Sequence, residues 1–369
     1  MKAIGIGIIG CGNVLDAYLP QCERLESRGA ARVHVACGRP AQRERALGLG
    51  ARRFTTNEND VLHAPEVDLV LILTSMPSHA RLTREALEAG KHVLVEKPFA
   101  TTLEEADSLL QLATRKQRHL ACAPFTTLSP TFRSIAQIIQ SGRIGKPCSA
   151  RARYGWAGPS WADWFYKPGG GCLFDLAVYC VTSLTGLLGP VHRVMAMTGA
   201  AIPRRMIEGR PTAVEAEDNA QVLLDFGDRC FGVVTSGFTM QQYRSPALEI
   251  YGTDGVVQMI GDDWDPDGHE LWENRVGAWQ VFKETAPDWS WTDGLPHTVQ
   301  RLREDKTPEV NPRHARHVLE ILLAAQRSGA SGSAIDVISR FDRAPCAPLP
   351  GSDPAHLQHD RSRPHPPEH

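Results

Sequence analysis

The first fifteen or so residues constrain the fold more than any other part of the chain. Residues 4–9 read Ile-Gly-Ile-Gly-Ile-Ile, and two closely spaced glycines, Gly10 and Gly12, follow at once. A buried strand that turns tightly through glycine into a helix leaves backbone N–H groups free at the helix N-terminus, where an anion such as phosphate can bind. We therefore expect residues 4–9 to be the first strand of a sheet, followed by a turn and a helix.

The glycine turn suits a dinucleotide when it is read in the right register. The literal pattern G-x-G-x-x-G lies at Gly5, Gly7 and Gly10, inside the expected strand, where Gly5 and Gly7 would allow a helix to pack closely. In the other register, Gly10 makes the tight turn and Gly12 lets the backbone approach a pyrophosphate. The position of the third glycine is then occupied by Leu15, so how closely the helix packs on the strand is an open question. A purely structural turn is the alternative. The residues expected to hold the phosphates are Gly10, Gly12, Asn13 and Val14.

Short apolar runs alternate with helical stretches through the first third of the chain. Residues 67–73 read Val-Asp-Leu-Val-Leu-Ile-Leu and lack the polar alternation of a half-exposed strand, which favours burial on both faces. Such strands, joined by crossover helices, form a parallel, doubly wound sheet of the α/β class. We expect an N-terminal domain over residues 1–124, with strands at residues 4–9, 33–37, 67–74, 92–95 and 119–123.

The remainder of the chain has a different character. All eight tryptophans lie beyond residue 150, and strand-like runs are separated by short turns, as in antiparallel sheets. We expect a C-terminal α+β domain over residues 125–343, with a large, mostly antiparallel, open sheet and strands at 220–226, 230–237, 247–251 and 256–260. A closing helix is expected from Pro312 to Ser328, ending before Gly329 and packing on the sheet.

Composition and charge exclude several classes of partner. The chain has 40 Lys and Arg against 42 Asp and Glu, a net charge of -2 that attracts neither nucleic acid nor anionic lipid. No apolar run approaches the roughly 18 residues of a membrane span. Nine cysteines without a C-x-x-C pair favour reduced thiols and a cytoplasmic location. Residues 344–369 hold seven prolines and four histidines, so we expect a disordered tail.

Histidines late in the chain offer a spacing that metals use. His314, His317 and Glu320 lie three residues apart on the expected closing helix. Because no further strong ligand accompanies them, a surface stripe is favoured and no metal is expected.

The end of the second expected strand bears on the choice of cofactor. NAD enzymes usually carry an acidic residue there for the ribose hydroxyls, whereas this chain has Gly38 and Arg39. An arginine suits the 2'-phosphate of NADP, so we favour NADP. The alternative is an exposed arginine that opens a basic helix, in which case NAD stays open.

A lysine follows another expected strand. Lys97 lies in the tripeptide Glu96-Lys97-Pro98, directly after residues 92–95, at the sheet edge where open parallel sheets bind their ligands. With the glycine turn and a loop in which His79 follows Ser75, this tripeptide resembles the glucose-fructose oxidoreductase, inositol dehydrogenase and MocA family. Ser75 stands where that family often has proline.

The resemblance continues in the second domain. Residues 169–179 read Gly-Gly-Gly-Cys-Leu-Phe-Asp-Leu-Ala-Val-Tyr, in which Asp175 matches the family and Tyr179 replaces its commoner histidine. Asp175 and Tyr179 are four residues apart, so a helix would present both on one face. A structural tyrosine is the alternative for Tyr179.

The resemblance implies an NAD(P)-dependent oxidoreductase with a Rossmann domain, acting on a hydroxyl or ketone carbon of a sugar, cyclitol or glycoside. A homodimer or homotetramer would form through the C-terminal sheet. The expected cofactor-binding residues are Gly10, Gly12, Asn13, Val14, Gly38, Arg39, Thr74, Ser75, His79, Glu96 and Lys97. The expected catalytic residues are Lys97, Tyr179 and Asp175, and the expected substrate-binding residues are Lys97, Tyr154, Trp156, Trp164, Asp175 and Tyr179.

The residues permit two divisions of labour. The Lys97 ammonium could stabilise the substrate oxygen and, with the oxidised nicotinamide, lower the pKa of Tyr179 so that Tyr179 is the base. Alternatively, neutral Lys97 is the base. Asp175 would bind a substrate hydroxyl or orient Lys97. Two other functions stay open on the same fold. One is a glycoside hydrolase with internal redox cycling. The other is a sugar-sensing regulator, which would not need the catalytic lysine, so the intact Glu96-Lys97-Pro98 argues against it.

Overall fold

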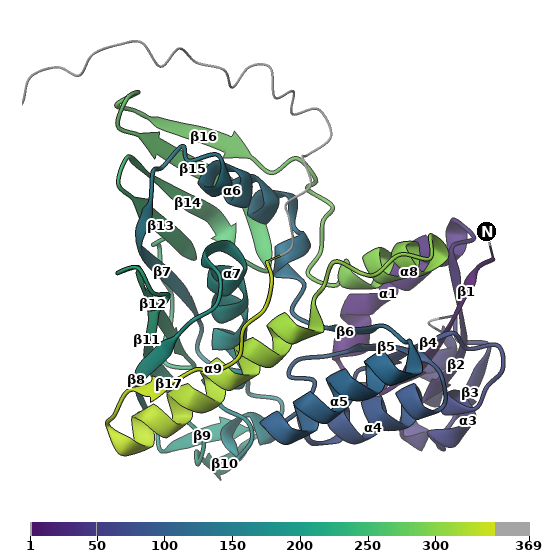
Figure 1. The fold of residues 1–369 in the computed structure, drawn as a ribbon. Helices are drawn as coiled ribbons and strands as arrows, with labels where there is room; N and C mark the ends of the chain where they lie inside the picture. The colour runs from purple at the N-terminus through teal and green to yellow at the C-terminus, as the bar shows by residue number, and fades with distance from the viewer. Residues whose placement is uncertain (1, 49, 344–369) are drawn as a thin grey trace, which may run out of the picture.

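Six parallel strands build the N-terminal sheet, in the order β3-β2-β1-β4-β5-β6, in the computed structural model, which describes residues 2–48 and 50–343 (Figure 1). This order, with its reversal beside β1, is that of a doubly wound Rossmann sheet and confirms the expected α/β class. The strands are β1 (Ile4–Ile9), β2 (Ala31–Cys37), β3 (Arg53–Thr55), β4 (Leu69–Ile72), β5 (His92–Val95) and β6 (Leu120–Cys122). The helices are α1 (Val14–Ser27), α2 (Arg43–Gly48), α3 (Asn59–Leu62), α4 (Met76–Glu88) and α5 (Leu103–Lys116).

Two glycines inside β1 make room for the elements beside it, as expected. A Cβ at Gly7 would lie 2.5 Å from the Val61 side chain of α3, and one at Gly5 would collide with the backbone oxygen of Glu66. The first two glycines of the apparent G-x-G-x-x-G pattern, Gly5 and Gly7, therefore serve packing. Within the N-terminal sheet only β3 was not predicted, because this three-residue edge strand has no apolar run.

The second sheet has nine strands in the order β16-β15-β14-β13-β7-β12-β11-β8-β17, and only β7 and β12 pair in parallel. The expected large, mostly antiparallel sheet is confirmed. Its strands are β7 (Pro147–Gly155), β8 (Arg193–Gly199), β11 (Asn219–Asp225), β12 (Phe231–Gly237), β13 (Leu248–Gly252), β14 (Gly255–Asp262), β15 (Asp265–Glu273), β16 (Trp279–Lys283) and β17 (Ile335–Asp336); β9 (Arg204–Ile207) and β10 (Arg210–Ala213) form a separate hairpin. Of the strands of this domain, β7, β8, β9, β10, β15, β16 and β17 were not predicted.

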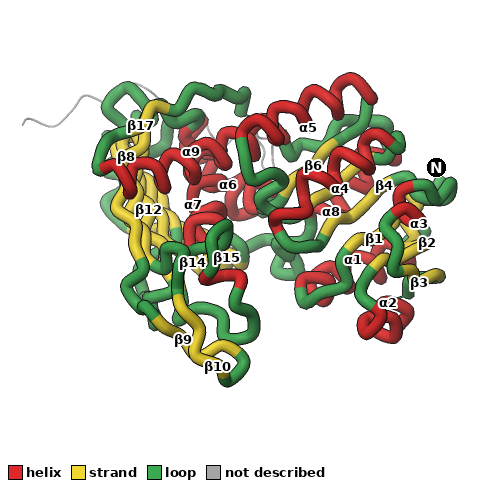
Figure 2. The backbone as a smooth tube through the Cα atoms, turned by 90° about the horizontal axis from the view of Figure 1, so that it is seen from below, coloured by secondary structure: helices red, strands yellow, loops and turns green. Residues whose placement is uncertain are grey.

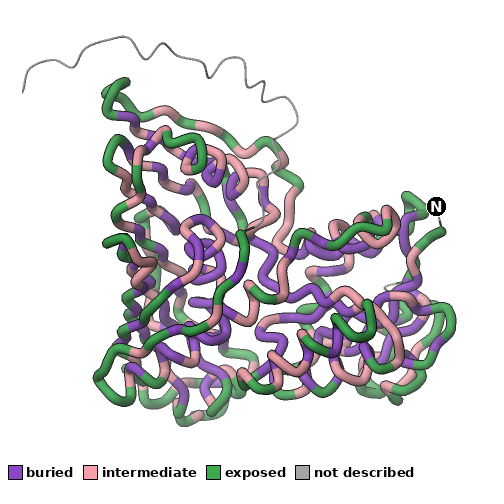
Figure 3. Tube along the Cα trace, in the orientation of Figure 1, coloured by how far each residue is buried: buried purple, intermediate pink, exposed green. Residues whose placement is uncertain are grey.

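Helices cover the face of this sheet that looks toward the N-terminal domain. Figure 2 shows α7 (Val178–Leu188) and α9 (Pro312–Ser331) between the two sheets, and α6 (Pro130–Gln140) packs on β14 and β15. The opposite face bears exposed side chains at alternate positions, such as those of β8. Figure 3 shows the resulting pattern, with buried segments concentrated in the strands and between the sheets.

The end of the closing helix corrects an expectation. Gly329 was expected to follow the helix, yet α9 runs through it to Ser331 and ends at Gly332, whose φ is +67°. Gly329 is needed for packing: a Cβ there would lie 2.2 Å from Oγ1 of Thr198 in β8. The glycine lets the helix approach the sheet and does not stop it.

One helix of the later sequence packs on the first domain. α8 (Gly294–Arg303) contacts α1 and β1, and its Leu295 and Val299 are buried in the core of the N-terminal sheet. Arg24 of α1 forms an ion pair of 2.7 Å with Asp293 at the start of α8. The expected domain boundary between residues 124 and 125 therefore does not separate all of the packing, because α8 belongs to the second segment of the sequence but packs on the first domain.

The expected tail, residues 344–369, lies outside the described residues. Within residues 2–48 and 50–343, no helix is long and apolar enough to cross a membrane.

Candidate active site

The glycine turn after β1 has the geometry that a phosphate requires. Gly10 has a φ of +106°, and a Cβ there would lie 2.6 Å from the carbonyl carbon of Leu73, so only glycine fits. Around Gly12, by contrast, no atom of the described chain lies within 4 Å of a built Cβ. Gly10 thus shapes the turn, and Gly12 leaves open space against the backbone, which fits a pyrophosphate.

The start of α1 completes this turn. Asn13 and Val14 are exposed at the helix N-terminus, whereas Leu15 is buried among the side chains between α1 and the sheet. The question left open at the third glycine position is answered: Leu15 belongs to the core and stays clear of the turn.

The loop after β2 lies against the glycine turn. A Cβ at Gly38 would be 3.1 Å from the side chain of Cys11, so the two loops touch. Arg39 is exposed beside Gly38, and no partner for its guanidinium is found among residues 2–48 and 50–343. A free cation next to the phosphate turn fits the added phosphate of NADP.

His79, an expected cofactor residue, braces two loops instead of facing open space. Its side chain is buried, with Nδ1 at 2.8 Å from the Pro98 carbonyl oxygen and Nε2 at 2.9 Å from that of Thr74. Burial lowers the pKa of His79. The histidine therefore holds the loop that contains Thr74 and Ser75 against the lysine tripeptide.

Glu96, another expected cofactor residue, is buried and holds neighbouring elements together. The carboxylate is 7% exposed, accepts a hydrogen bond of 2.7 Å from the Tyr18 hydroxyl of α1 and one of 3.2 Å from the backbone N–H of Lys97. Burial, and then the Glu96 charge, raise the pKa of Tyr18. Glu96 thus ties α1, and with it the glycine turn, to the backbone of Lys97.

The three expected catalytic residues meet across the domain boundary. Lys97 Nζ lies 2.8 Å from Asp175 Oδ1 and 2.8 Å from the Asp175 carbonyl oxygen, and 5.3 Å from the centre of the Tyr179 ring. The two charged side chains are 11% and 16% exposed. A π-helical turn over Leu173–Ala177 precedes α7, an irregularity frequent at functional sites. The spacing of Asp175 and Tyr179 therefore does bring both to one lysine.

The electrostatics of Tyr179 differ from the expected direction. Burial, followed by the charges of Glu96 and the nearby Tyr154 and Asp175, raises the pKa of Tyr179 well above its ordinary value. Lowering this pKa would require the positive charge of an oxidised nicotinamide, which the chain itself does not supply. In the protein alone, Tyr179 is a neutral hydrogen-bonding group.

The expected aromatic residues are only partly gathered at the lysine. Tyr154 meets Tyr179 edge to face with ring centres 5.5 Å apart, and its ring also lies 6.0 Å from that of Trp264. Trp156 stacks on Trp161 at 5.5 Å. Trp164 stacks instead on its neighbour Phe165, and its described contacts do not include Lys97, Asp175 or Tyr179.

Sequence reasoning missed Trp264 and Tyr18. Trp264 lies in the turn between β14 and β15, far along the chain from Tyr154, and nothing in its neighbourhood indicates a site. Tyr18 is one helical turn beyond Val14, and its only signal is its place on the buried face of α1.

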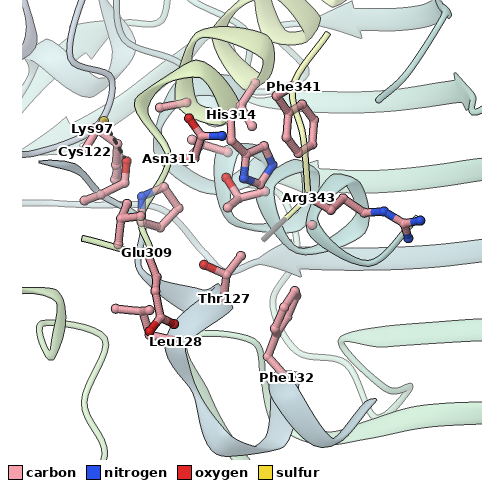
Figure 4. Close-up of a pocket in the computed structure, with 18 of the residues that line it drawn as sticks. Lys97, Cys122, Thr127, Leu128, Phe132, Glu309, Asn311, His314, Phe341 and Arg343 are labelled. Atoms are coloured by element: carbon pink, nitrogen blue, oxygen red, sulfur yellow. Dashed lines mark hydrogen bonds between the residues drawn. The ribbon is translucent and has the colours of Figure 1, made fainter. Parts of the chain in front are cut away.

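A small cavity borders Lys97 away from Asp175 and Tyr179, neither of which lines it (Figure 4). Its volume is about 80 Å³, far below the roughly 300–1,000 Å³ of ligand pockets. Phe132, Thr182 and Phe341 contribute to its walls. The cavity is a gap between α6, α7 and α9 and does not offer space for a sugar.

The late histidines have structural partners. His314 Nε2 lies 2.7 Å from the Thr185 hydroxyl, and His317 Nε2 accepts from the backbone N–H of Val191. Burial lowers the pKa of His314 to about 3 and that of His317 to about 4. His317 and Glu320 are buried, so the expected surface stripe is wrong. Among residues 2–48 and 50–343, no group of three or more His, Cys, Asp or Glu is arranged to hold a metal ion.

Comparisons with known proteins agree with this geometry. Residues 4–123 match the family described as "Oxidoreductase family, NAD-binding Rossmann fold", and residues 132–258 match its "GFO/IDH/MocA C-terminal domain". The glycine turn, the sheet order and these matches define an NAD-binding oxidoreductase. The chain belongs to the Gfo/Idh/MocA family.

Curated relatives of the chain include sugar dehydrogenases. It is 24% identical over 353 residues to the D-apiose dehydrogenase of Paraburkholderia graminis, covering 92% of this chain and 91% of that protein. It is 26% identical over 280 residues to the rhizopine catabolism protein MocA of Rhizobium meliloti, covering 75% of this chain and 84% of that one. A solved levoglucosan dehydrogenase with NADH and levoglucosan shares the fold, with a TM-score of 0.81 at 21% identity over 91% of this chain and all of that one.

Proposed function

We propose that this oxidoreductase acts on a hydroxyl-bearing carbon of a sugar, cyclitol or glycoside, or on the matching ketone. The observation that carries the proposal is the contact of Lys97 with Asp175 and Tyr179 at the carboxyl end of β5. These groups can hold two neighbouring hydroxyls at once, since Lys97 Nζ donates hydrogen bonds and the Asp175 carboxylate accepts them. Relatives that act on D-apiose and D-xylose support this substrate class.

The chain's own groups account for the movement of the proton. When bound, the nicotinamide exchanges a hydride with the substrate carbon. In this proposal the substrate oxygen binds within hydrogen-bond reach of Lys97 Nζ, and Lys97 in its free-amine form accepts the hydroxyl proton during oxidation. Asp175 orients the Lys97 amine through their 2.8 Å contact. The raised pKa of Tyr179 favours this division, because a phenol that keeps its proton is a hydrogen-bond donor and a poor base.

The preferred cofactor is proposed to be NADP, with NAD as the alternative. Arg39, exposed beside the glycine turn and without a partner among the described residues, supports the choice, although the similar levoglucosan dehydrogenase is described with NADH. The absence of an acidic side chain at Gly38 and Arg39 removes the usual partner of the ribose hydroxyls of NAD.

The first test combines cofactor analysis with a substrate panel. The ultraviolet spectrum and the mass of any released nucleotide are measured on the purified protein, and NAD and NADP are then titrated into it. Free sugars, cyclitols and methyl glycosides are assayed by formation of reduced nicotinamide. We expect reversible binding of NADP and net oxidation of at least one compound. Tightly retained NAD, with glycoside cleavage and no net reduction, would contradict the proposal and favour the hydrolase. Binding of both ligands without turnover would favour the regulator.

We also propose a homodimer or homotetramer through the outer face of the C-terminal sheet. Met195, Met197, Leu223 and Phe231 are large apolar side chains exposed on neighbouring strands of that face. Exposed apolar surface of this extent indicates an interface. Light scattering is expected to give a dimer or tetramer that Leu223→Asp dissociates; a monomer at micromolar concentration would contradict this proposal.

A cytoplasmic location is proposed from the cysteines. The eight described cysteines are free, and only Cys148 among them is exposed. Free thiols persist in a reducing compartment. Fractionation of the source cells tests this assignment.

A further inference from the structure

A second hollow lies near the candidate active site and is far larger than the cavity that borders Lys97. Its volume is about 710 Å³, within the range of ligand pockets. It lies where β7 ends and where β14 turns into β15, and the connection between β12 and β13 borders it. We call it the aromatic groove; the residues used below are Tyr154, Trp156, Tyr243, Arg244, Trp264 and Glu270.

One residue of the groove wall, Tyr154, also contacts the candidate active site. The ring of Tyr154 touches that of Tyr179 at 5.5 Å and that of Trp264 at 6.0 Å, and Tyr154 and Trp264 both line the groove. A substrate ring held at Lys97 therefore has the groove as its neighbour. A free monosaccharide leaves this space to water.

The chemistry of the walls suits a second ring. Trp156 and Trp264 present flat apolar surfaces, which pack against the faces of sugars and aryl groups. The polar side chains there are mostly satisfied: the Tyr243 hydroxyl donates to Asp262, and Gln258 donates to Glu270. Arg244 is exposed, and no partner for it is found in the described chain, so its guanidinium is available to hydroxyl oxygens.

We propose that the aromatic groove binds the second ring of a glycoside or disaccharide whose first ring reacts at Lys97. The substrate is then an O-linked two-ring compound rather than a free monosaccharide. This inference rests on the proposed function, because it places the reacting ring at Lys97. The groove would recognise a flat ring that is joined to the first ring by a glycosidic bond. The experiment below distinguishes an aryl group from a second sugar as that ring.

The experiment compares matched compounds. D-Glucose, D-galactose and D-xylose are assayed as free sugars, as methyl glycosides and as phenyl glycosides, with cellobiose and lactose as disaccharides. For the sugar that reacts, we expect KM to fall about fivefold to tenfold from the methyl to the phenyl glycoside or to the disaccharide, the effect of one well-packed ring. Whichever of the two gains more identifies the second ring.

Variants locate the gain in the groove. Arg244→Ala is expected to remove much of this gain while leaving kcat and KM for the methyl glycoside within twofold. Trp264→Ala is expected to remove most of the gain, and Trp264→Phe restores much of it. Arg244 is exposed and has no partner within the part of the chain that the structure describes, so Arg244→Ala is expected to fold even if Trp264→Ala does not. Trp279→Ala, in β16 outside the groove, is the matched control and keeps the gain.

The outcomes separate the two proposals. Binding of each glycoside to the cofactor-loaded protein is also measured by calorimetry. Equal KM and equal binding for methyl glycosides, phenyl glycosides and disaccharides would overturn the groove assignment and leave the oxidoreductase proposal intact. Selective binding of two-ring compounds that Arg244→Ala weakens, without oxidation of any compound, would overturn the proposed function and keep the groove assignment.

Discussion

The two halves of the candidate site are specified in different ways. On the cofactor side, Gly10 and Gly12 are two residues apart in one turn, and backbone geometry does most of the work. On the substrate side, Lys97, Tyr154, Asp175 and Trp264 come from distant parts of the chain and meet only through packing. The comparison teaches that a site built from backbone can be predicted from local sequence, whereas a site built from converging side chains needs the fold.

Removing the lysine is the most severe test of the substrate side. Lys97→Met should lower kcat/KM by about 10³-fold, because both the proton acceptor and the charge at the substrate oxygen are lost. Cofactor affinity should change by less than tenfold, since the turn at Gly12 is untouched. Steady-state kinetics and cofactor titration measure the two effects, and Lys116→Met on the surface of α5 is the control. An active Lys97→Met protein would show that the lysine is not catalytic.

A pair of glycine variants tests the cofactor side. Gly10→Ala should destabilise the fold by about 2–4 kcal/mol, because the residue has a φ of +106° and its Cβ would overlap the Leu73 backbone. Gly12→Ala should leave the melting temperature nearly unchanged and weaken dinucleotide binding at least tenfold, since its Cβ would occupy the open space. Thermal unfolding without cofactor, and titration with it, separate the two. Equal unfolding losses for both variants would contradict the distinction.

Asp263 beneath the substrate side gives a pH dependence. Burial raises its pKa to about 7, so above the ordinary pKa of 3.8 the unfolded chain releases a proton that the folded protein keeps. Stability supplied by this group is therefore full below pH 3.8 and is lost as the pH rises toward 7. Asp263→Asn keeps the contact with Ser183 and should stabilise the protein at pH 7 relative to pH 5 by about 1–4 kcal/mol. Denaturant unfolding of both proteins at pH 5 and pH 7 measures this effect. If the substitution changes the free energy of unfolding equally at both pH values, Asp263 does not have a raised pKa.

Arg39 gives the smallest expected effect. Arg39→Ala should weaken NADP binding about tenfold through loss of a charge-assisted contact, and should leave NAD binding within twofold. Fluorescence titration of both cofactors measures the ratio, with Arg43→Ala as the control. Stronger binding of NAD than of NADP by the unmutated protein would end the proposed preference.

Sequence patterns predicted the parallel sheet, the glycine turn and the lysine tripeptide because each depends on neighbouring residues. Helical spacing predicted that Asp175 and Tyr179 lie on one face, but it predicted neither their contact with Lys97 nor the π-helical turn. The role of His79 was not predictable, because its partners are backbone carbonyls that only the fold brings near. Gly329 misled for a related reason: a glycine can end a helix or let it pack closely, and Thr198 decides which.

The return of α8 to the first sheet limits how this protein can be divided. Leu295, Val299 and the Arg24–Asp293 ion pair mean that residues 1–124 alone would expose one side of α1 to water. A gene fragment cut at that boundary should yield an aggregation-prone product, whereas one that also encodes α8 on a linker should express better. The nucleotide half of the molecule is therefore not a detachable module, and recombination between relatives would have to exchange both segments together.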